Sequence, residues 1–272
     1  MGWKRQARQG VNRVLRRFAC ELVRVNRPPY VIGFLPLQET IEKARAAGMS
    51  LSDWIDQQHN EPGVTPRTIR QLRELGVFQG PIDTVCEIGP GSGRFLEKIL
   101  QHCQPRQYEI YETEADWSEW LAKSYPVKPR AADGKSLSAT ASDAIDLVTS
   151  FRVFVALPFL VTLRYLNEMV RVVRPGGTVV FDVVTEECMD EATTTKWLAS
   201  GSTYPVVTSR RLIAHFFEQR GFRLMGDFFM PLRPGRSEYF VYKAPQTKAV
   251  LQGAVETLAS PPSGIEAPAK WL

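Results

Sequence analysis

The chain has 272 residues, of which 44% are hydrophobic and 23% charged, a composition typical of a soluble globular protein with one sizeable α/β domain. No apolar run approaches the ~20 residues of a membrane-spanning helix, and no apolar segment with a cleavage site opens the chain, so we expect neither an integral membrane protein nor a secreted one. The net charge is +5, and the four cysteines and three histidines have neither disulfide pairing nor zinc-site spacing, which favours a cytoplasmic location.

The first 30 residues carry most of the positive charge. They hold eight Lys or Arg residues and one acid, Glu21, so the rest of the chain is slightly acidic. Apolar residues fall on one helical face (Val11, Val14, Leu15, Phe18, Leu22) and arginines on the other (Arg13, Arg16, Arg17, Arg24). This amphipathic helix either packs on its own domain or lets residues 1–27 contact an anionic membrane. Nucleic acid is not an expected partner, because the body of the chain has no matching basic patch.

Residues 1–78 are expected to form a helical extension that caps the domain behind it. One helix is predicted over residues 39–47 and ends at Gly48. Another is predicted to begin at Thr65-Pro66, where a capping residue precedes proline at the first helical position, and to end near Gly76. Helices in this place could wall a substrate pocket.

Residues 79–244 alternate strand-like and helix-like patterns. Strands are predicted at residues 82–89, 107–112, 144–151 and 177–185. Pro158 opens a helix whose apolar positions include Leu160 and Leu166. This alternation predicts a largely parallel, doubly wound sheet.

The end of the chain predicts a different arrangement. A capped helix follows Ser209 and ends at Gly221, and two strand-like segments then flank residues 233–236. These segments predict an antiparallel hairpin at the edge of the sheet. Residues 245–272 are rich in Ala, Pro and Ser and predict a flexible tail.

The segment VCEIGPGSGRFLEKIL (residues 85–100) is typical of a strand, a glycine-rich turn and the start of a helix that together hold an adenosine-containing ligand. Gly89, Gly91 and Gly93 let the backbone approach a ligand closely, and the helix offers its N-terminal amides. Dinucleotide folds use a GxGxxG turn in a similar place, but here the sixth position is Arg94. A nicotinamide-dependent oxidoreductase is therefore a less favoured alternative.

Two acidic residues follow this turn. Glu112 ends the next predicted strand, 19 residues past Gly93, where a carboxylate can accept hydrogen bonds from ribose hydroxyls. Asp133, in the pair Asp133-Gly134, either faces the amine of adenine or simply forms a turn.

The segment EMVRVVRPGGTVVFDVV (residues 168–184) predicts a helix that ends at Arg-Pro-Gly-Gly, followed by a strand. Together with the glycine turn, YEIYE and AIDLVTS, it closely resembles the class I S-adenosylmethionine-dependent methyltransferases over residues 80–243. The resemblance implies a Rossmann-like, seven-stranded sheet with one antiparallel strand, and S-adenosylmethionine as cofactor. It places cofactor contacts at Glu87, Gly89, Gly91, Gly93, Glu112, Asp133 and Phe151.

Methyl transfer from a sulfonium mainly requires alignment, and a hydroxyl acceptor also benefits from a general base. The candidate bases are Glu186, Glu187, Tyr204 and His215. Arg152, at the end of the fourth predicted strand, could bind a carboxylate or phosphate on the acceptor. The positions where metal-dependent catechol-type methyltransferases hold their ligands read Phe151-Arg152 and Thr185-Glu186-Glu187, so no metal is expected.

These patterns favour a metal-independent methyltransferase that acts on a hydroxyl of a small-molecule or glycan-type acceptor. The acceptor could carry a negative charge. Two alternatives stay open. One is an N-methyltransferase acting on a small molecule, and the other is a catalytically silent partner subunit that binds S-adenosylmethionine.

Overall fold

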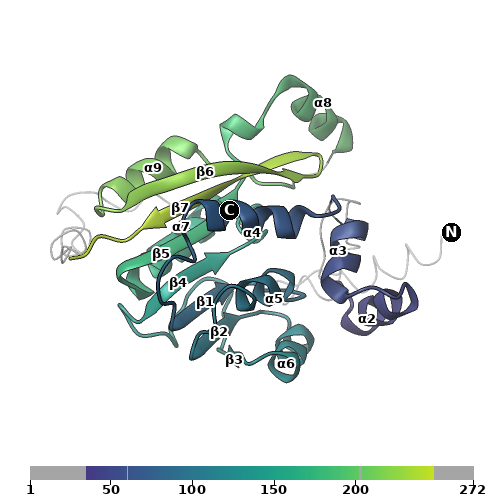
Figure 1. The fold of residues 1–272 in the computed structure, drawn as a ribbon. Coiled ribbons are helices and arrows are strands. Elements are labelled where there is room, and N and C mark those ends of the chain that lie inside the picture. The colour runs from purple at the N-terminus through teal and green to yellow at the C-terminus, as the bar shows by residue number, and fades with distance from the viewer. Residues whose placement is uncertain (1–34, 60, 202–203, 248–272) are drawn as a thin grey trace, which may run out of the picture.

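A computed structural model describes residues 35–59, 61–201 and 204–247 (Figure 1). The predicted basic helix, its membrane contact through residues 1–27, and most of the predicted tail over residues 245–272 lie outside the described residues. None of the described helices is long and apolar enough to cross a membrane.

A seven-stranded sheet forms the centre of the molecule, with the strand order β3-β2-β1-β4-β5-β7-β6. Strands β1 to β5 pair in parallel, and β7 is antiparallel to both β5 and β6. This arrangement confirms the predicted Rossmann-like fold with its C-terminal hairpin. The strands are β1 (Thr84–Ile88), β2 (Gln107–Tyr111), β3 (Lys128–Pro129), β4 (Ile145–Ser150), β5 (Val173–Val183), β6 (Arg223–Leu232) and β7 (Gly235–Lys243).

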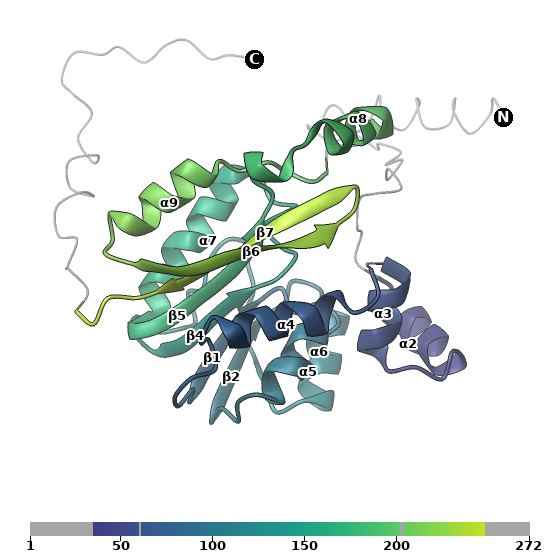
Figure 2. The same ribbon diagram turned by 45° about the horizontal axis from the view of Figure 1, so that its top comes forward.

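The central strands are buried on both faces, as their near-continuous apolar sequences require. Every residue of β4 is buried. Helices α7 and α9 cover one face of the sheet, and α4, α5 and α6 cover the other (Figure 2). These helices are α4 (Val64–Glu74), α5 (Arg94–Leu100), α6 (Ala115–Ser124), α7 (Phe159–Val172) and α9 (Arg210–Glu218).

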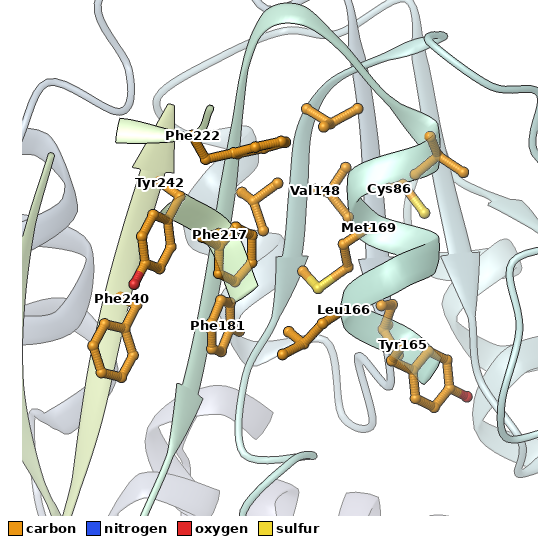
Figure 3. Close-up of a cluster of buried hydrophobic side chains, with 14 of the residues drawn as sticks. Cys86, Val148, Tyr165, Leu166, Met169, Phe181, Phe217, Phe222, Phe240 and Tyr242 are labelled. Atoms are coloured by element: carbon orange, nitrogen blue, oxygen red, sulfur yellow. The ribbon is translucent and has the colours of Figure 1, made fainter. Parts of the chain in front are cut away.

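The core beneath α7 and α9 is rich in aromatic side chains (Figure 3). Phe217 of α9 stacks on Tyr242 of β7 with ring centroids 4.0 Å apart, and on Phe181 of β5 at 5.6 Å. Leu166 and Met169 of α7 are fully buried in the same cluster. Leu160 was expected on this apolar face, but it is 71% exposed because it lies in the first turn of α7, beyond the cluster.

Among the described residues, three short helices precede the sheet, and together they form the cap (residues 37–74). The predicted helix at residues 39–47 is α2 (Leu37–Ala46), and α4 begins at Val64 with Gly63 as its N-cap. Thr65 therefore does not cap the helix, and its hydroxyl instead donates to Asp56 Oδ1 at 2.8 Å. Between α2 and α4 lies α3 (Leu51–His59), which the sequence pattern did not predict. Figures 1 and 2 show α2 and α3 together beside one end of the sheet.

The two elements that follow β5 also lacked a sequence prediction, as did α6 and β3. The 3-10 helix η2 (Glu186–Cys188) follows β5, and α8 (Glu191–Ser200) follows η2. Asp190 caps α8 by accepting a hydrogen bond from the Thr193 amide at 2.7 Å. The Arg-Pro-Gly-Gly segment belongs to β5 itself, which begins at Val173, four residues before the predicted strand.

Candidate active site

A cavity of about 320 Å³ lies where β1, β2 and β4 end, which is within the size range of small-molecule sites. The strand order reverses between β1 and β4, and ligands of open α/β sheets bind outside the carboxyl ends of the strands at such a point. Residues that follow the three strands form the inner wall. Ile55 and His59 of α3, together with Arg94 and Tyr204, also line the cavity.

The three positions of the turn require glycine for different structural reasons. All have positive φ, at +61°, +53° and +74° for Gly89, Gly91 and Gly93. A Cβ at Gly89 would lie 2.5 Å from Val153 Cγ2, and one at Gly93 would lie 2.6 Å from Leu121 Cδ2. A Cβ at Gly91 would meet no atom within 4 Å, and this residue lines the cavity. Gly91 therefore leaves open space for a ligand, whereas Gly89 and Gly93 allow close packing.

Glu112 lies in the cavity wall and is 7% exposed. Its Oε2 accepts a hydrogen bond from the Gly91 amide at 2.8 Å, and its Oε1 accepts one from the Glu114 amide at 3.0 Å. Burial raises the pKa of this carboxyl, and the backbone amides partly oppose that rise. An ionised carboxylate has about four acceptor positions, so Glu112 has acceptor capacity left for a ribose hydroxyl.

Glu87 is buried behind the turn, at 1% exposure, and does not line the cavity. The Tyr108 hydroxyl donates to Glu87 Oε2 at 2.5 Å. Burial raises the pKa of Glu87 to about 7, against the effect of Tyr108 and with a contribution from the charge of Glu112. Glu87 thus lies in a second layer, beneath the residues that form the wall.

Asp133 is exposed and outside the wall, whereas its neighbour Gly134 lines the cavity. Asp133 Oδ1 accepts hydrogen bonds from the amides of Lys135 and Ser136 at 2.9 and 2.7 Å. The carboxylate therefore shapes the loop, and the backbone of the loop faces the cavity.

Phe151 and Arg152 both line the cavity at the end of β4. Phe151 stacks on Phe95 of α5 at 4.4 Å between centroids. The Arg152 guanidinium donates to the Pro231 carbonyl at 2.6 Å, and its Nε lies 3.8 Å from the buried carboxylate of Asp182. The positive charge predicted for the pocket is present, and an internal carboxylate compensates it.

A second buried ion pair joins the cap to the glycine turn. Arg94, which directly follows the last glycine of the turn, contacts Asp56 of α3, with Nη1 and Oδ1 2.5 Å apart. Asp56 Oδ2 also accepts the Thr65 amide at 3.0 Å, so one carboxylate connects α3, α4 and α5. Neither Asp56 nor Arg94 was a predicted site residue.

Tyr204 and His59 both line the cavity and have ionisable rings. Tyr204 is 7% exposed, and burial raises its pKa to about 12. His59, the last residue of α3, is exposed at the mouth of the cavity and packs edge-on against Trp54 at 5.6 Å. Of the four candidate bases named from the sequence, Tyr204 lines the cavity.

The other three candidates lie outside the cavity wall, and all are exposed. Glu186 Oε2 accepts a hydrogen bond from the Arg210 amide at 2.8 Å, at the start of α9. The Glu187 carbonyl accepts one from the Arg236 guanidinium at 2.7 Å. His215 lies in the last turn of α9. Within the part of the chain that the structure describes, no group of three or more His, Cys, Asp and Glu residues could hold a metal ion.

The family model described as "Methyltransferase domain" matches residues 35–225. This chain belongs to the methyltransferase-domain family. The match includes α2, α3 and α4 as well as the sheet through the start of β6, so the cap forms part of the matched unit. No curated protein matches the sequence of this chain.

Solved structures share the fold at low sequence identity. An O-methyltransferase family protein from Burkholderia thailandensis has a TM-score of 0.55 and 15% identity, covering 79% of this chain and 64% of its own. A chain of the complex between the Haloferax volcanii Trm112 methyltransferase activator and a methyltransferase has a TM-score of 0.54 and 17% identity. The match covers 75% of the present chain and 97% of that chain. The N-methyltransferase NodS from Bradyrhizobium japonicum WM9, in complex with S-adenosylhomocysteine, has a TM-score of 0.52 and 15% identity. The match covers 76% of the present chain and 98% of NodS.

S-adenosylmethionine is the cofactor of this methyltransferase, and the described residues fit it. The open space at Gly91 and the acceptor oxygens of Glu112 suit a ribose, and the Gly134 loop supplies backbone next to them. The bound cofactor supplies an activated methyl group on a sulfonium, so the protein's main task is to align an acceptor with that carbon.

Proposed function

We propose that this methyltransferase transfers the methyl group of S-adenosylmethionine to a hydroxyl group on a small-molecule or glycan-type acceptor. One observation carries the proposal. One cavity is lined by Gly91 and Glu112, which suit the nucleotide part of the cofactor, and also by His59, Arg94 and Tyr204, which we assign to the acceptor. Donor and acceptor that share this cavity would meet near the end of β4, with proton-accepting and charged side chains on the acceptor side.

The size of the cavity supports a small reacting group. At about 320 Å³ it lies near the lower end of the range for ligand sites, about 300–1,000 Å³. The cofactor and the reacting part of the acceptor would fill it, and the rest of a glycan-type acceptor would remain outside. Arg94 and Arg152 make the wall compatible with an anionic acceptor, although Asp56 and Asp182 already balance much of their charge.

Metal independence is supported by the partners of the nearby carboxylates. Glu112 accepts two backbone amides, Asp56 pairs with Arg94, and Asp182 lies beside Arg152. Asp56 and Asp182 are therefore already compensated by arginines, and Glu112 is the one acid among the described residues that line the cavity. A cytoplasmic location is supported by Cys86, Cys103 and Cys188, which are all free thiols.

N-methyl transfer is the second candidate function. A histidine at the mouth of the cavity could take a proton from an ammonium as well as from a hydroxyl. An acceptor screen distinguishes the two outcomes, because ester, ether and amine methyl groups differ in their stability to base and in their mass-spectral fragments.

Isothermal calorimetry is the first test. We expect S-adenosylmethionine and S-adenosylhomocysteine to bind with micromolar dissociation constants and NADH not to bind. A screen with labelled methyl donor then identifies the acceptor. Binding of NADH alone would overturn the proposal, and cofactor binding without turnover on any acceptor would favour a silent partner subunit.

A further inference from the structure

His59 is the one imidazole among the described residues that line the cavity. It ends α3, and Ile55, one turn earlier, lines the same cavity. Its exposure at the mouth gives it contact with solvent, to which a captured proton could be released. His59 therefore lies in the cavity wall, among the residues that we assign to the acceptor, and has a route for proton exchange with solvent.

The other ionisable groups of the cavity wall are poor proton acceptors at neutral pH. Arg94 and Arg152 are guanidiniums that stay protonated. Burial raises the pKa of Tyr204 and of Tyr165 to about 12 and also raises the pKa of Tyr111, so these three hydroxyls hold their protons. Glu112 lies at the nucleotide end and already accepts the amides of Gly91 and Glu114.

The charges that face His59 keep it neutral. Partial burial lowers the pKa of His59 below its usual value, and three cations lower it further: Arg94 of α5, Lys43 of α2 and Arg233 of the β6–β7 turn. The nearest acid on its own helix, Asp56, is occupied by Arg94 and Thr65. A neutral imidazole at neutral pH is the state that a general base requires.

We propose that His59 is the general base of the methyl transfer, an inference that rests on the proposed function. An imidazole nitrogen takes the proton of the acceptor hydroxyl while the oxygen lone pair forms the new bond to the methyl carbon. The carbon–sulfur bond breaks, its electron pair stays on sulfur, and S-adenosylhomocysteine leaves. The imidazolium then returns its proton to water at the mouth of the cavity.

The first test needs no acceptor. The full chain holds only three histidines, so His59→Gln assigns the His59 resonance in an NMR titration of the imidazoles. We expect the pKa of His59 to fall further with S-adenosylmethionine than with S-adenosylhomocysteine, by roughly half a unit or more, because only the former carries a sulfonium charge nearby. Equal values with the two ligands would overturn the proposal, since the imidazole would then be remote from the methyl group.

The second test measures turnover with the acceptor found in the screen. His59→Gln should lower kcat by about 10²–10⁴-fold, remove the acidic limb of the pH profile of kcat, and leave the dissociation constant of S-adenosylmethionine within about twofold. Added imidazole should restore part of the activity of His59→Ala. His102→Gln is the matched control, because His102 stacks on Phe78 outside the cavity wall and should keep full activity.

The outcomes separate the inference from the function on which it rests. If the wild type does not bind S-adenosylmethionine, the proposed function fails and His59 loses its role with it. If the wild type binds and turns over but His59→Gln keeps the wild-type kcat and pH profile, the function stands and the inference is wrong. Circular dichroism and thermal unfolding of each variant show whether a loss of activity reflects a loss of fold.

Discussion

The buried carboxyl of Glu87 makes the stability of this protein depend on pH in a direction opposite to that of most acids. Burial raises its pKa from 4.5 to about 7 in the folded chain. The stabilising contribution of the protonated carboxyl is therefore complete below about pH 4.5, and it is lost as pH rises toward 7. At 1.36 kcal/mol per pKa unit, the loss amounts to about 3 kcal/mol at pH 8.

Glu87→Gln replaces this carboxyl with a neutral group of the same shape that can still accept the Tyr108 hydroxyl. We expect the variant to gain up to about 3 kcal/mol in free energy of unfolding relative to wild type between pH 5 and pH 8, because the charged form no longer has to be buried. Urea unfolding of the cofactor-free protein at each pH measures the difference. If the two proteins showed parallel pH profiles, the burial-driven pKa shift would be refuted.

Glu109 provides a control of opposite sign on the neighbouring strand. It is buried to the same extent, at 1% exposure, but the Arg130 guanidinium hydrogen-bonds to its carboxylate. Burial raises its pKa, and the bonds from Arg130 and Thr140 outweigh that effect and leave the pKa below its usual value. Its contribution is present above the unfolded pKa and lost in acid, so Glu109→Gln should destabilise the protein at pH 8.

Four further changes test the site and the core. Glu112→Ala should weaken binding of S-adenosylmethionine by about 1–3 kcal/mol in calorimetry, and unchanged affinity would exclude a ribose contact. Gly91→Ala should abolish cofactor binding and lower the free energy of unfolding by about 1–2 kcal/mol. Gly48→Ala is the control, because Gly48 has a similar φ of +65° and no atom lies within 4 Å of the added methyl group. This control should show only the loss of stability. Asp56→Ala leaves its buried arginine partner uncompensated and should cost about 3–5 kcal/mol in urea unfolding, and a loss below 1 kcal/mol would show that the pair is solvated. Phe217→Ala should lower the free energy of unfolding by about 3–5 kcal/mol in urea and leave the cofactor affinity unchanged. An unchanged urea midpoint would contradict the stacked core.

The sheet and the glycine turn could be predicted because their sequence signals are local. The central strands are almost continuously apolar, and Gly89, Gly91 and Gly93 all adopt a positive φ that other residues rarely tolerate. Ser209 accepts the Leu212 amide and caps α9 as its position before the helix indicated. In each case the physical requirement falls on a few neighbouring residues.

Helix α3 could not be predicted from apolar periodicity, because two of its three buried residues are polar. Ser52 and Asp56 are buried through hydrogen bonds to Glu97, Thr65 and Arg94, which lie elsewhere in the chain. A signal for its start was nevertheless present. Ser50 precedes Asp53 with capping spacing, and its Oγ accepts the Asp53 amide at 3.1 Å.

The catalytic candidates show a second limit of sequence patterns. Glu186 and Glu187 follow β5 at the ligand-binding edge of the sheet, but η2 begins there and turns both residues toward solvent. Position along a strand indicates an edge of the sheet, and the fold of the next few residues decides which side chains face the cavity. That information is not contained in the spacing.

The ion pair between Asp56 and Arg94 fixes the cap to the residue that directly follows the glycine turn. Ser52 of the same helix also hydrogen-bonds to Glu97 of α5, so α3 is held against the glycine turn by two contacts from a separate stretch of the chain. Under the proposed function, this arrangement would allow α3 to diverge with the acceptor during evolution while the glycine turn stays unchanged, provided that Asp56 and Arg94 are inherited together.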